Sequence, residues 1–130
     1  MKHPNSLSHD ERLRKRGSIR RLFESGKGGF VYPLRYMWYV VDTDEDNSNS
    51  VEVMFSVPKR FHKRANRRNT LRRRVKESYR LQKSIVLEVA EGKKPQKIEM
   101  ALLYSTKDFK SYKTISNAVR KVLTNIKNEL

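Results

Sequence analysis

A strand and a strongly basic helix follow one another in residues 51–80, which read VEVMFSVPKRFHKRANRRNTLRRRVKESYR. Apolar residues occupy positions 51, 53, 55 and 57 and alternate with residues 52, 54 and 56, as is typical of a half-buried antiparallel strand. Pro58 ends that strand. A helix is predicted from about Lys63 to Glu91. Its core-facing positions recur at three- and four-residue steps: Leu71, Val75, Ser78 or Tyr79, Gln82, and Ile85 or Val86.

Like charges recur along this helix every four residues, at Arg60, Arg64, Arg68, Arg72, Lys76 and Arg80. Each such pair costs an isolated helix roughly 0.2–0.5 kcal/mol. Glu77 is the one acidic residue between positions 59 and 80. A solvated helix face normally mixes in acidic residues, so this pattern favours a polyanion as the partner.

The composition of the whole chain agrees with that interpretation. The 130 residues include 30 Lys and Arg against 14 Asp and Glu, a net charge of +16 that attracts nucleic acid or anionic lipid. The chain has no cysteine, which excludes a disulfide framework, a thiolate zinc site and a cysteine nucleophile. With no apolar run that could cross a bilayer, the sequence predicts a cytoplasmic protein with no membrane partner. We expect one RNA-binding domain over 1–130, with 1–10 a flexible leader and the loop at 43–50 disordered.

Further elements are predicted on both sides of the basic stretch. Residues 11–29 contain a short amphipathic helix with Ile19, Leu22 and Phe23 on its apolar stripe, ended by glycines at 26, 28 and 29. A strand from Leu34 to Val41 is expected to form a hairpin with residues 51–57 across a polar turn. After a turn at 92–95, a strand is expected from Ile98 to Tyr104. The last helix begins near Tyr112, with one apolar face made of Ile115, Ala118, Val119, Val122, Leu123 and Ile126.

This order of helices and strands, α-β-β-α-β-α with room for one more short strand, predicts the α+β class. The expected architecture is a two-layer sandwich with helices on one face of a small mixed sheet. No internal repeat or long linker divides the chain.

The angular positions of the basic residues separate them into two groups when Leu71 marks the core side of the helix. A basic flank lies beside the core stripe and consists of Asn69, Arg72, Arg73, Lys76 and Arg80. The N-terminal arginines, Arg64, Arg67 and Arg68, point toward the core side. Because unpaired buried guanidinium groups are costly, the helix is expected to start beyond the edge of the sheet, where these arginines line an open edge.

The two groups suit different parts of a nucleic acid. The flank can follow a phosphate backbone. The N-terminal arginines, near a strand that carries Tyr36 and Trp38, can hold single-stranded RNA through charge and base stacking. Core packing is the alternative for the aromatic residues, and strand alternation alone leaves open which face of the strand is buried.

The sequence offers no catalytic constellation. The three histidines, at positions 3, 9 and 62, have no catalytic pairing, so a base and an acid for hydrolysis are missing. The acidic residues at positions 42, 44, 45 and 46 lack the glycine and the distal glutamate of an EF-hand loop, and we interpret them as a solubilising turn. The residues alone therefore indicate an RNA- or DNA-binding protein.

The segment FSVPKRFHKRANRRNTLRRRVKESYRLQK resembles the signature of the bacterial ribonuclease P protein component. The matching residues are Val57, Lys59 and Arg60, then Arg68 and Asn69, then Arg72 and Arg73, then Glu77, Tyr79 and Arg80. RLRKRGSIRRLFESG is similar to the opening helix of that family at Leu22, Phe23 and Gly26.

The resemblance implies an αβββαβα fold of the ribosomal protein S5 domain 2 type, with a left-handed βαβ crossover. It implies the protein part of an endoribonuclease in which the RNA subunit, with Mg²⁺ bound mainly by that RNA, removes the 5′ leader of precursor tRNA. The partners implied are ribonuclease P RNA and precursor tRNA, with no small-molecule substrate. By the same resemblance, Arg68, Asn69, Arg72 and Arg73 contact the catalytic RNA. Candidates for a leader-binding cleft are Phe23, Tyr36 or Trp38, Lys59 and Arg60.

Two positions depart from the family pattern. Thr70 replaces the second arginine of the R-N-R motif, and Arg67 or Arg74 is the candidate to compensate. Ile19 stands where many members carry an aromatic residue. The alternatives are a general RNA-binding or ribosome-associated protein of similar fold and a self-sufficient nuclease.

Overall fold

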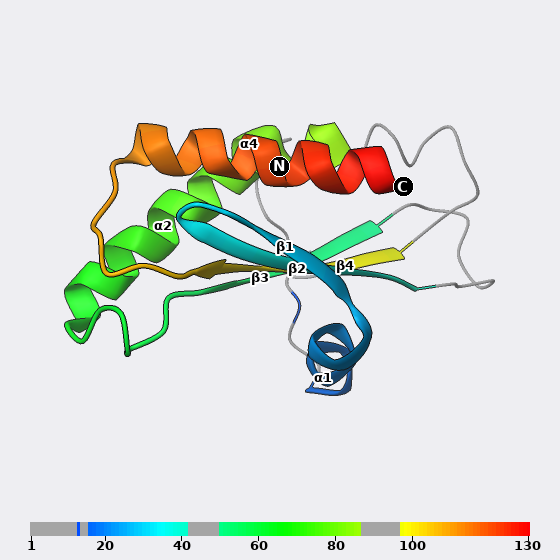
Figure 1. Cartoon of the computed structure of the whole chain (residues 1–130), viewed down its shortest axis with the longest axis horizontal. Helices are drawn as coiled ribbons and strands as arrows, with labels where there is room; N and C mark the ends of the chain where they lie inside the picture. The colour runs from blue at the N-terminus through cyan, green and yellow to red at the C-terminus, as the bar shows by residue number, and fades with distance from the viewer. Residues whose placement is uncertain (1–12, 14–15, 42–49, 87–96) are drawn as a thin grey trace, which may run out of the picture.

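The structure is a computed structural model that describes residue 13 and residues 16–41, 50–86 and 97–130. Its elements follow the order αβββαβα, as the resemblance implies (Figure 1). They are α1 (Arg16–Ser25), β1 (Lys27–Val31), β2 (Leu34–Val41), β3 (Ser50–Ser56), α2 (Ala65–Gln82), β4 (Lys97–Tyr104) and α4 (Tyr112–Glu129). The expected leader at 1–10, the polar turn after Val41 and the turn at 92–95 lie outside the described residues.

The four strands form one mixed sheet in the order β1-β2-β4-β3. The predicted hairpin between β2 and β3 is therefore wrong, because β2 pairs with β1 and β4. β3 pairs with β4 alone, and that pairing is parallel rather than antiparallel. β4 lies between β2 and β3 and is buried on both of its faces, as a central strand is, with six of its eight residues buried.

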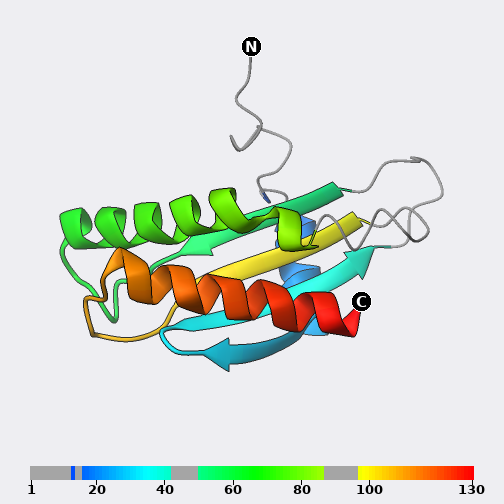
Figure 2. The same cartoon turned by 90° about the horizontal axis from the view of Figure 1, so that it is seen from above.

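β3, α2 and β4 form a crossover unit on one side of the sheet. Figure 2 looks down on the sheet with α2 and α4 nearer the viewer. β3 and β4 both run toward the end of the sheet where α2 begins, and with these strands pointing upward β4 lies to the left of β3. The connection is left-handed, as the resemblance implies and against the common right-handed rule.

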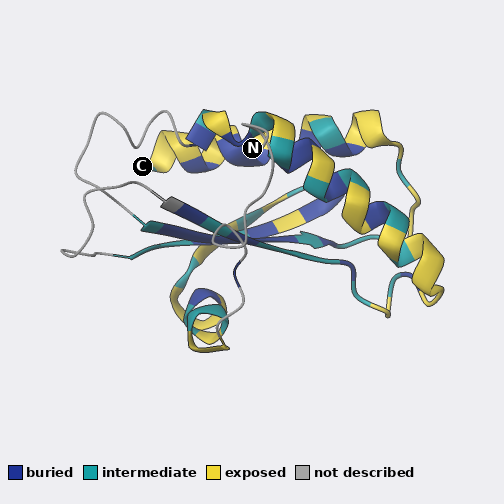
Figure 3. Cartoon of the chain, turned by 180° about the vertical axis from the view of Figure 1, so that it is seen from behind, coloured by how far each residue is buried: buried dark blue, intermediate teal, exposed yellow. Residues whose placement is uncertain are grey.

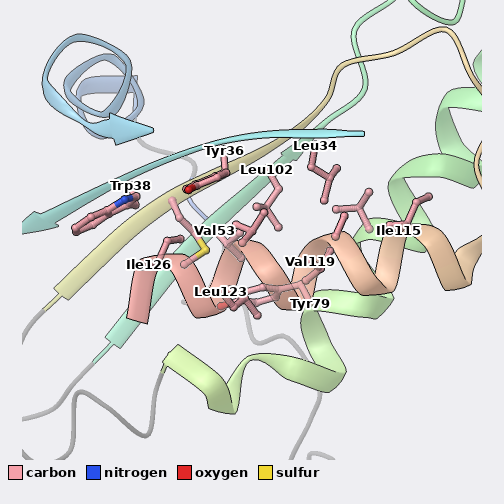
Figure 4. Close-up of a cluster of buried hydrophobic side chains, with 14 of the residues drawn as sticks. Leu34, Tyr36, Trp38, Val53, Tyr79, Leu102, Ile115, Val119, Leu123 and Ile126 are labelled. Carbon is pink, nitrogen blue, oxygen red and sulfur yellow. The ribbon is translucent and has the colours of Figure 1, made fainter. Parts of the chain in front are cut away.

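The main core lies between the sheet and the two long helices (Figure 4). Leu34, Tyr36 and Trp38 of β2 point into it. The sequence left open which face of this strand is buried, and the structure shows that it is the face with these three residues. α2 contributes Leu71, Val75 and Tyr79, in agreement with the predicted stripe. All six predicted apolar residues of the last helix are buried, namely Ile115, Ala118, Val119, Val122, Leu123 and Ile126.

α1 lies on the opposite face of the sheet from α2 and α4 (Figure 1). The expectation of helices on one face is correct for the two long helices and wrong for this one. Leu22 is buried against Ala101 of β4 and Leu13, as a second, smaller core. Phe23, predicted on the same apolar stripe, is 45% exposed because α1 covers the sheet with a narrower face than the pattern suggests.

An ion pair beneath α1 ties the helix to the central strand. The guanidinium of Arg21 donates a hydrogen bond of 2.7 Å to the carboxylate of Glu99, which is fully buried. The Arg21 guanidinium also stacks over the ring of Tyr39, 5.0 Å from its centre. The hydrogen bond to Glu99 raises the pKa of Arg21 above its ordinary value despite the cost of burial. α1 is therefore held against the sheet by this polar contact as well as by its apolar residues.

The ends of the basic helix differ from the sequence prediction. α2 begins at Ala65, with Arg64 in extended conformation before it, and ends at Gln82 rather than continuing to Glu91. A turn at Lys83 separates α2 from a short helical segment at 84–86, and residues 87–91 lie outside the described part. Glycines 28 and 29, predicted to end α1, belong to β1, which pairs with β2. No helix within the described ranges is long and apolar enough to span a bilayer.

Candidate nucleic-acid interface

The basic flank of α2 is turned to solvent along the first half of the helix. Asn69, Arg72 and Arg73 are exposed, whereas Lys76 is half-buried. The first turns of α2 extend beyond the ends of the strands, and most of the residues in these turns are exposed (Figure 3). This arrangement confirms that the helix starts beyond the sheet edge, and it leaves the guanidinium groups of the flank accessible to a phosphate backbone.

The far end of the flank is partly neutralised within the helix. Arg80 forms an ion pair with Glu77 one turn earlier, with Nε donating a hydrogen bond of 3.0 Å. That contact lowers the pKa of the Glu77 carboxyl below its usual value. The cationic surface of α2 is therefore strongest near Arg72 and Arg73 and weaker toward Arg80.

Trp38, the aromatic residue expected beside the N-terminal arginines, is not open to a base, because its ring is buried in the core on β2. Arg64 is exposed at the start of α2. Arg68 turns back and donates hydrogen bonds from Nη1 to the carbonyl oxygens of His62, at 3.1 Å, and Lys63, at 2.7 Å. Arg68 thus shapes the loop that leads into α2 in addition to adding positive charge.

Arg67 and Arg74 meet at an aromatic ring from the β4–α4 loop. Their guanidinium carbons lie 4.5 Å and 4.6 Å from the ring centre of Phe109. Arg74 also donates a hydrogen bond of 2.6 Å to the carbonyl oxygen of Lys110. The loop therefore holds one edge of α2, a contact that the sequence analysis missed.

A groove of about 640 Å³ opens on the face of the sheet that carries α1. Its walls come from β1, β2, the loop before α2 and the end of β4, and the lining residues are Gly28, Gly29, Phe30, Arg35, Tyr36, Met37, Arg60, Phe61 and Ser105. The guanidinium of Arg60 stacks on Phe61, 4.8 Å from the ring centre. Aromatic rings beside cationic side chains suit an unpaired nucleic-acid strand.

The predicted cleft residues are distributed unevenly with respect to this groove. Arg60 lines it, and Lys59 is exposed next to it in the chain. Tyr36 also lines it, although only 9% of the residue is exposed. Trp38 lies in the core with Lys27 over its ring at 5.4 Å, and Phe23 is exposed on α1 without lining the groove.

Sequence reasoning missed Phe30, Arg35, Met37 and Phe61 as groove residues. Of these residues, Arg35 could have been recognised from the sequence. It occupies the face of β2 opposite to Leu34, Tyr36 and Trp38, and an arginine in a strand indicates that its face is open to solvent. Phe30 had no such signal, because its neighbouring glycines were assigned to the end of a helix rather than to a strand.

The titratable side chains around the site serve structure. The ring of His62 is 4% exposed, and Nε2 lies 2.9 Å from the carbonyl oxygen of Thr106. Tyr32 donates a hydrogen bond to the carboxylate of Asp108, which lowers the pKa of that carboxyl. Burial raises the pKa of the nearby Tyr104 hydroxyl. Within the part of the chain that the structure describes, no group of three or more His, Cys, Asp or Glu could hold a metal ion.

Comparison with protein families gives a match to the model described as Ribonuclease P over residues 7–127. The match covers nearly the whole chain, including α1, the sheet, α2 and α4. The chain belongs to the ribonuclease P protein family.

Curated relatives agree with that assignment. The ribonuclease P protein component of Porphyromonas gingivalis is 31% identical over 120 residues, covering 92% of this chain and 85% of the relative. The ribonuclease P protein component of Chlorobium phaeobacteroides is 32% identical over 133 residues, covering 96% of this chain and 90% of the relative.

Solved structures show the same fold. The ribonuclease P protein of Staphylococcus aureus superposes with a TM-score of 0.61 at 21% identity, covering 89% of this chain and 94% of that one. The ribonuclease P protein of Thermotoga maritima superposes with a TM-score of 0.64 at 20% identity, covering 88% and 96%. The mixed α+β architecture of this chain is therefore that of these structures, while the more specific S5 domain 2 label stays a prediction.

Proposed function

We propose that this ribonuclease P family member is the protein subunit of a ribonucleoprotein that removes the 5′ leader of precursor tRNA. The observation that carries the proposal is the presence of two separate cationic surfaces in one small domain. One is the exposed side of α2, centred on Arg72 and Arg73. The other is the groove on the α1 side of the sheet, with Arg35 and Arg60 among its walls. A protein that assists an RNA enzyme must hold that RNA and its substrate together.

The α2 surface docks on the catalytic RNA in this proposal. Its contacts are Arg64, Arg67, Arg68, Asn69, Arg72, Arg73, Lys76 and Arg80. Phosphate contacts of this kind are sequence-independent and depend steeply on salt, which suits an extended RNA surface. Arg72 and Arg73 are the strongest candidates because both are exposed and neither forms an ion pair among the described residues. Arg80 must exchange Glu77 for a phosphate, so its contribution is smaller.

The groove holds the single-stranded leader. Arg60 supplies positive charge in its wall, the exposed Lys59 next to it in the chain adds to that charge, and Phe30 and Phe61 supply aromatic surface for bases. Tyr36 contributes to the wall of the groove. Trp38 is buried in the core and does not contact the leader in this proposal. Phe23 is exposed on α1 and is a candidate contact for leader nucleotides that leave the groove.

Hydrolysis falls to the RNA subunit. The described side chains offer no paired general acid and base, since His62 is buried against a backbone carbonyl. Mg²⁺ would be held mainly by the RNA, and it would activate the attacking water and stabilise the leaving oxygen. The acidic residues at positions 42, 44, 45 and 46 lie outside the described residues. The role of this chain is to bind and orient the two RNA molecules.

Reconstitution tests the proposal directly. Catalytic RNA from a bacterial ribonuclease P is mixed with this protein and a precursor tRNA at a Mg²⁺ concentration too low for the RNA alone to cleave. We expect the protein to restore cleavage at the mature 5′ end. Binding to both RNAs without restored cleavage would favour a general RNA-binding protein. Cleavage by protein rigorously freed of RNA would instead identify a self-sufficient nuclease.

A further inference from the structure

Thr70 stands where the family motif carries an arginine, and the structure shows what surrounds that position. The Thr70 hydroxyl donates a hydrogen bond of 3.0 Å to the carbonyl oxygen of Asn66 within the same helix. This bond turns the side chain back onto the helix and leaves it with no charge to offer a phosphate. Arg67 precedes Thr70 by three residues and Arg74 follows it by four, so both lie on the same side of α2 as Thr70.

Phe109 links these two arginines. The guanidinium carbons lie 4.5 Å and 4.6 Å from the ring centre, and two turns of helix separate their backbones. One ring therefore lies within stacking distance of both guanidinium groups. A guanidinium over an aromatic face is stabilised by the ring quadrupole, which here holds two like charges close together.

Other contacts fix the ring and one of the arginines in place. Phe109 packs edge-on against the buried His62 ring, with 6.4 Å between centres. Arg74 donates its 2.6 Å hydrogen bond to the backbone carbonyl of Lys110, the residue after Phe109. Arg67 remains exposed, and 39% of Phe109 is exposed as well. The cluster is ordered on the protein side and open on the solvent side, as a prearranged anion contact requires.

We propose that Arg67, Phe109 and Arg74 together replace the motif arginine that Thr70 lacks. Phe109 is a positioning residue: it holds the two guanidinium groups one turn to either side of Thr70, where a phosphate of the catalytic RNA would otherwise meet an arginine at position 70. The inference deepens the proposed function of α2 and rests on that function. It assigns a role in RNA docking to the β4–α4 loop, which lies about 40 residues away from the motif.

The test is a set of variants titrated with the catalytic RNA at several salt concentrations. Phe109→Leu keeps the apolar contact with His62 but removes the ring, and we expect RNA affinity to fall about three- to tenfold. Phe109→Tyr restores the ring and should bind within about twofold of the wild type. The matched control is Tyr112→Leu, because Tyr112 is 38% exposed and no guanidinium stacks on it among the described residues. This control should bind as the wild type does.

Thr70→Arg makes the test specific for compensation. In the wild-type background the added arginine should change RNA affinity by less than about twofold, because Arg67 and Arg74 already contact the phosphate in this proposal. In Phe109→Leu, or in the exposed variant Arg67→Ala, the same substitution should recover most of the lost affinity. A general effect of added charge would give equal gains in all backgrounds, since independent sites contribute additively.

Two results would overturn the inference: unchanged RNA affinity in Phe109→Leu, or an equal gain from Thr70→Arg in every background. The Arg67→Ala background guards against loss of folding in Phe109→Leu, because Arg67 is exposed. Arg73→Ala separates this inference from the proposed function. If Arg73→Ala weakens binding while Phe109→Leu does not, only the compensation is wrong. If none of the basic variants affects binding, the docking role of α2 itself is wrong.

Discussion

The two faces of the sheet are built differently, although the same strands supply both. One face is sealed by α2 and α4 over an apolar core that includes Leu102 and Val119. The other face is covered in part by α1 and carries a half-buried ion pair, a small apolar cluster and the open groove. The sealed face provides the stability that lets the other face stay open and polar. Neighbouring residues of one strand can therefore differ sharply in what they contribute.

The largest expected effect compares adjacent residues of β4. Leu102 faces the sealed core and is 1% exposed, whereas Leu103 is half-buried on the α1 side. We expect Leu102→Ala to reduce the free energy of unfolding by about 2–5 kcal/mol and Leu103→Ala by about 1 kcal/mol. Urea denaturation measures both. Equal losses would mean that the α1 face is packed as tightly as the sealed face.

The ion pair under α1 gives the next largest effect. Arg21→Ala leaves the buried carboxylate of Glu99 without its partner, and we expect a loss of about 1–3 kcal/mol, reduced from a fully buried pair because Arg21 is 39% exposed. Arg20→Ala is the control, since its contact with Glu24 is at the surface and 4.0 Å long. Thermal unfolding should separate the two variants. If both melt together, α1 is not held by Glu99.

The two RNA surfaces should respond differently to loss of one arginine each. Arg60→Ala, in the groove, is expected to weaken binding of precursor tRNA by the holoenzyme about three- to tenfold and to leave mature tRNA binding unchanged. Arg73→Ala, on α2, should weaken binding of the catalytic RNA and make the salt slope shallower by about one. Equal effects of Arg60→Ala on precursor and mature tRNA would remove Arg60 from the leader path.

The smallest expected effect concerns the ion pair of Glu77 and Arg80 at the surface of α2. The pKa of Glu77 is lowered in the folded protein, so the pair stabilises the fold above the usual titration of a glutamate, near pH 4.5, and that contribution is lost as the pH falls through the lowered value. Because Glu77 is exposed and Arg80 is only half-buried, the melting temperature should differ from that of Glu77→Gln by at most about 2 °C at pH 7 and by less at low pH. A growing difference on acidification would contradict this sign.

Much of the fold follows from the sequence because the sealed face imposes strict periodicity. The stripe of α4 and the bounds of β2 were predicted as the structure has them, since every third or fourth residue of the helix and every second residue of the strand must enter one core. The hairpin of β2 with β3 was predicted wrongly. Pairing is decided by competition among strands, and β4 comes from a segment more than 40 residues after β3 begins.

The site was harder to predict because it, too, depends on contacts between segments that are distant in the sequence. The charges of α2 are local in sequence, so their exposure follows from the helical repeat. The groove requires knowing that Arg35 and Met37 share a face with Phe30 across the β1–β2 pairing. The contact of Arg67 with Phe109 joins two segments that only the tertiary structure brings together.

The central position of β4 also sets the order in which the protein can fold during synthesis. β2 and β3 do not pair with each other, and each depends on β4 for its pairing toward the middle of the sheet. A nascent chain that has emerged only as far as α2 has the arginines of the RNA-docking helix but no strand to join the two halves of the sheet. Contacts between distant segments form late. The basic helix would therefore emerge from the ribosome before its core can close, and a ribosome-bound fragment ending before Lys97 should remain sensitive to protease.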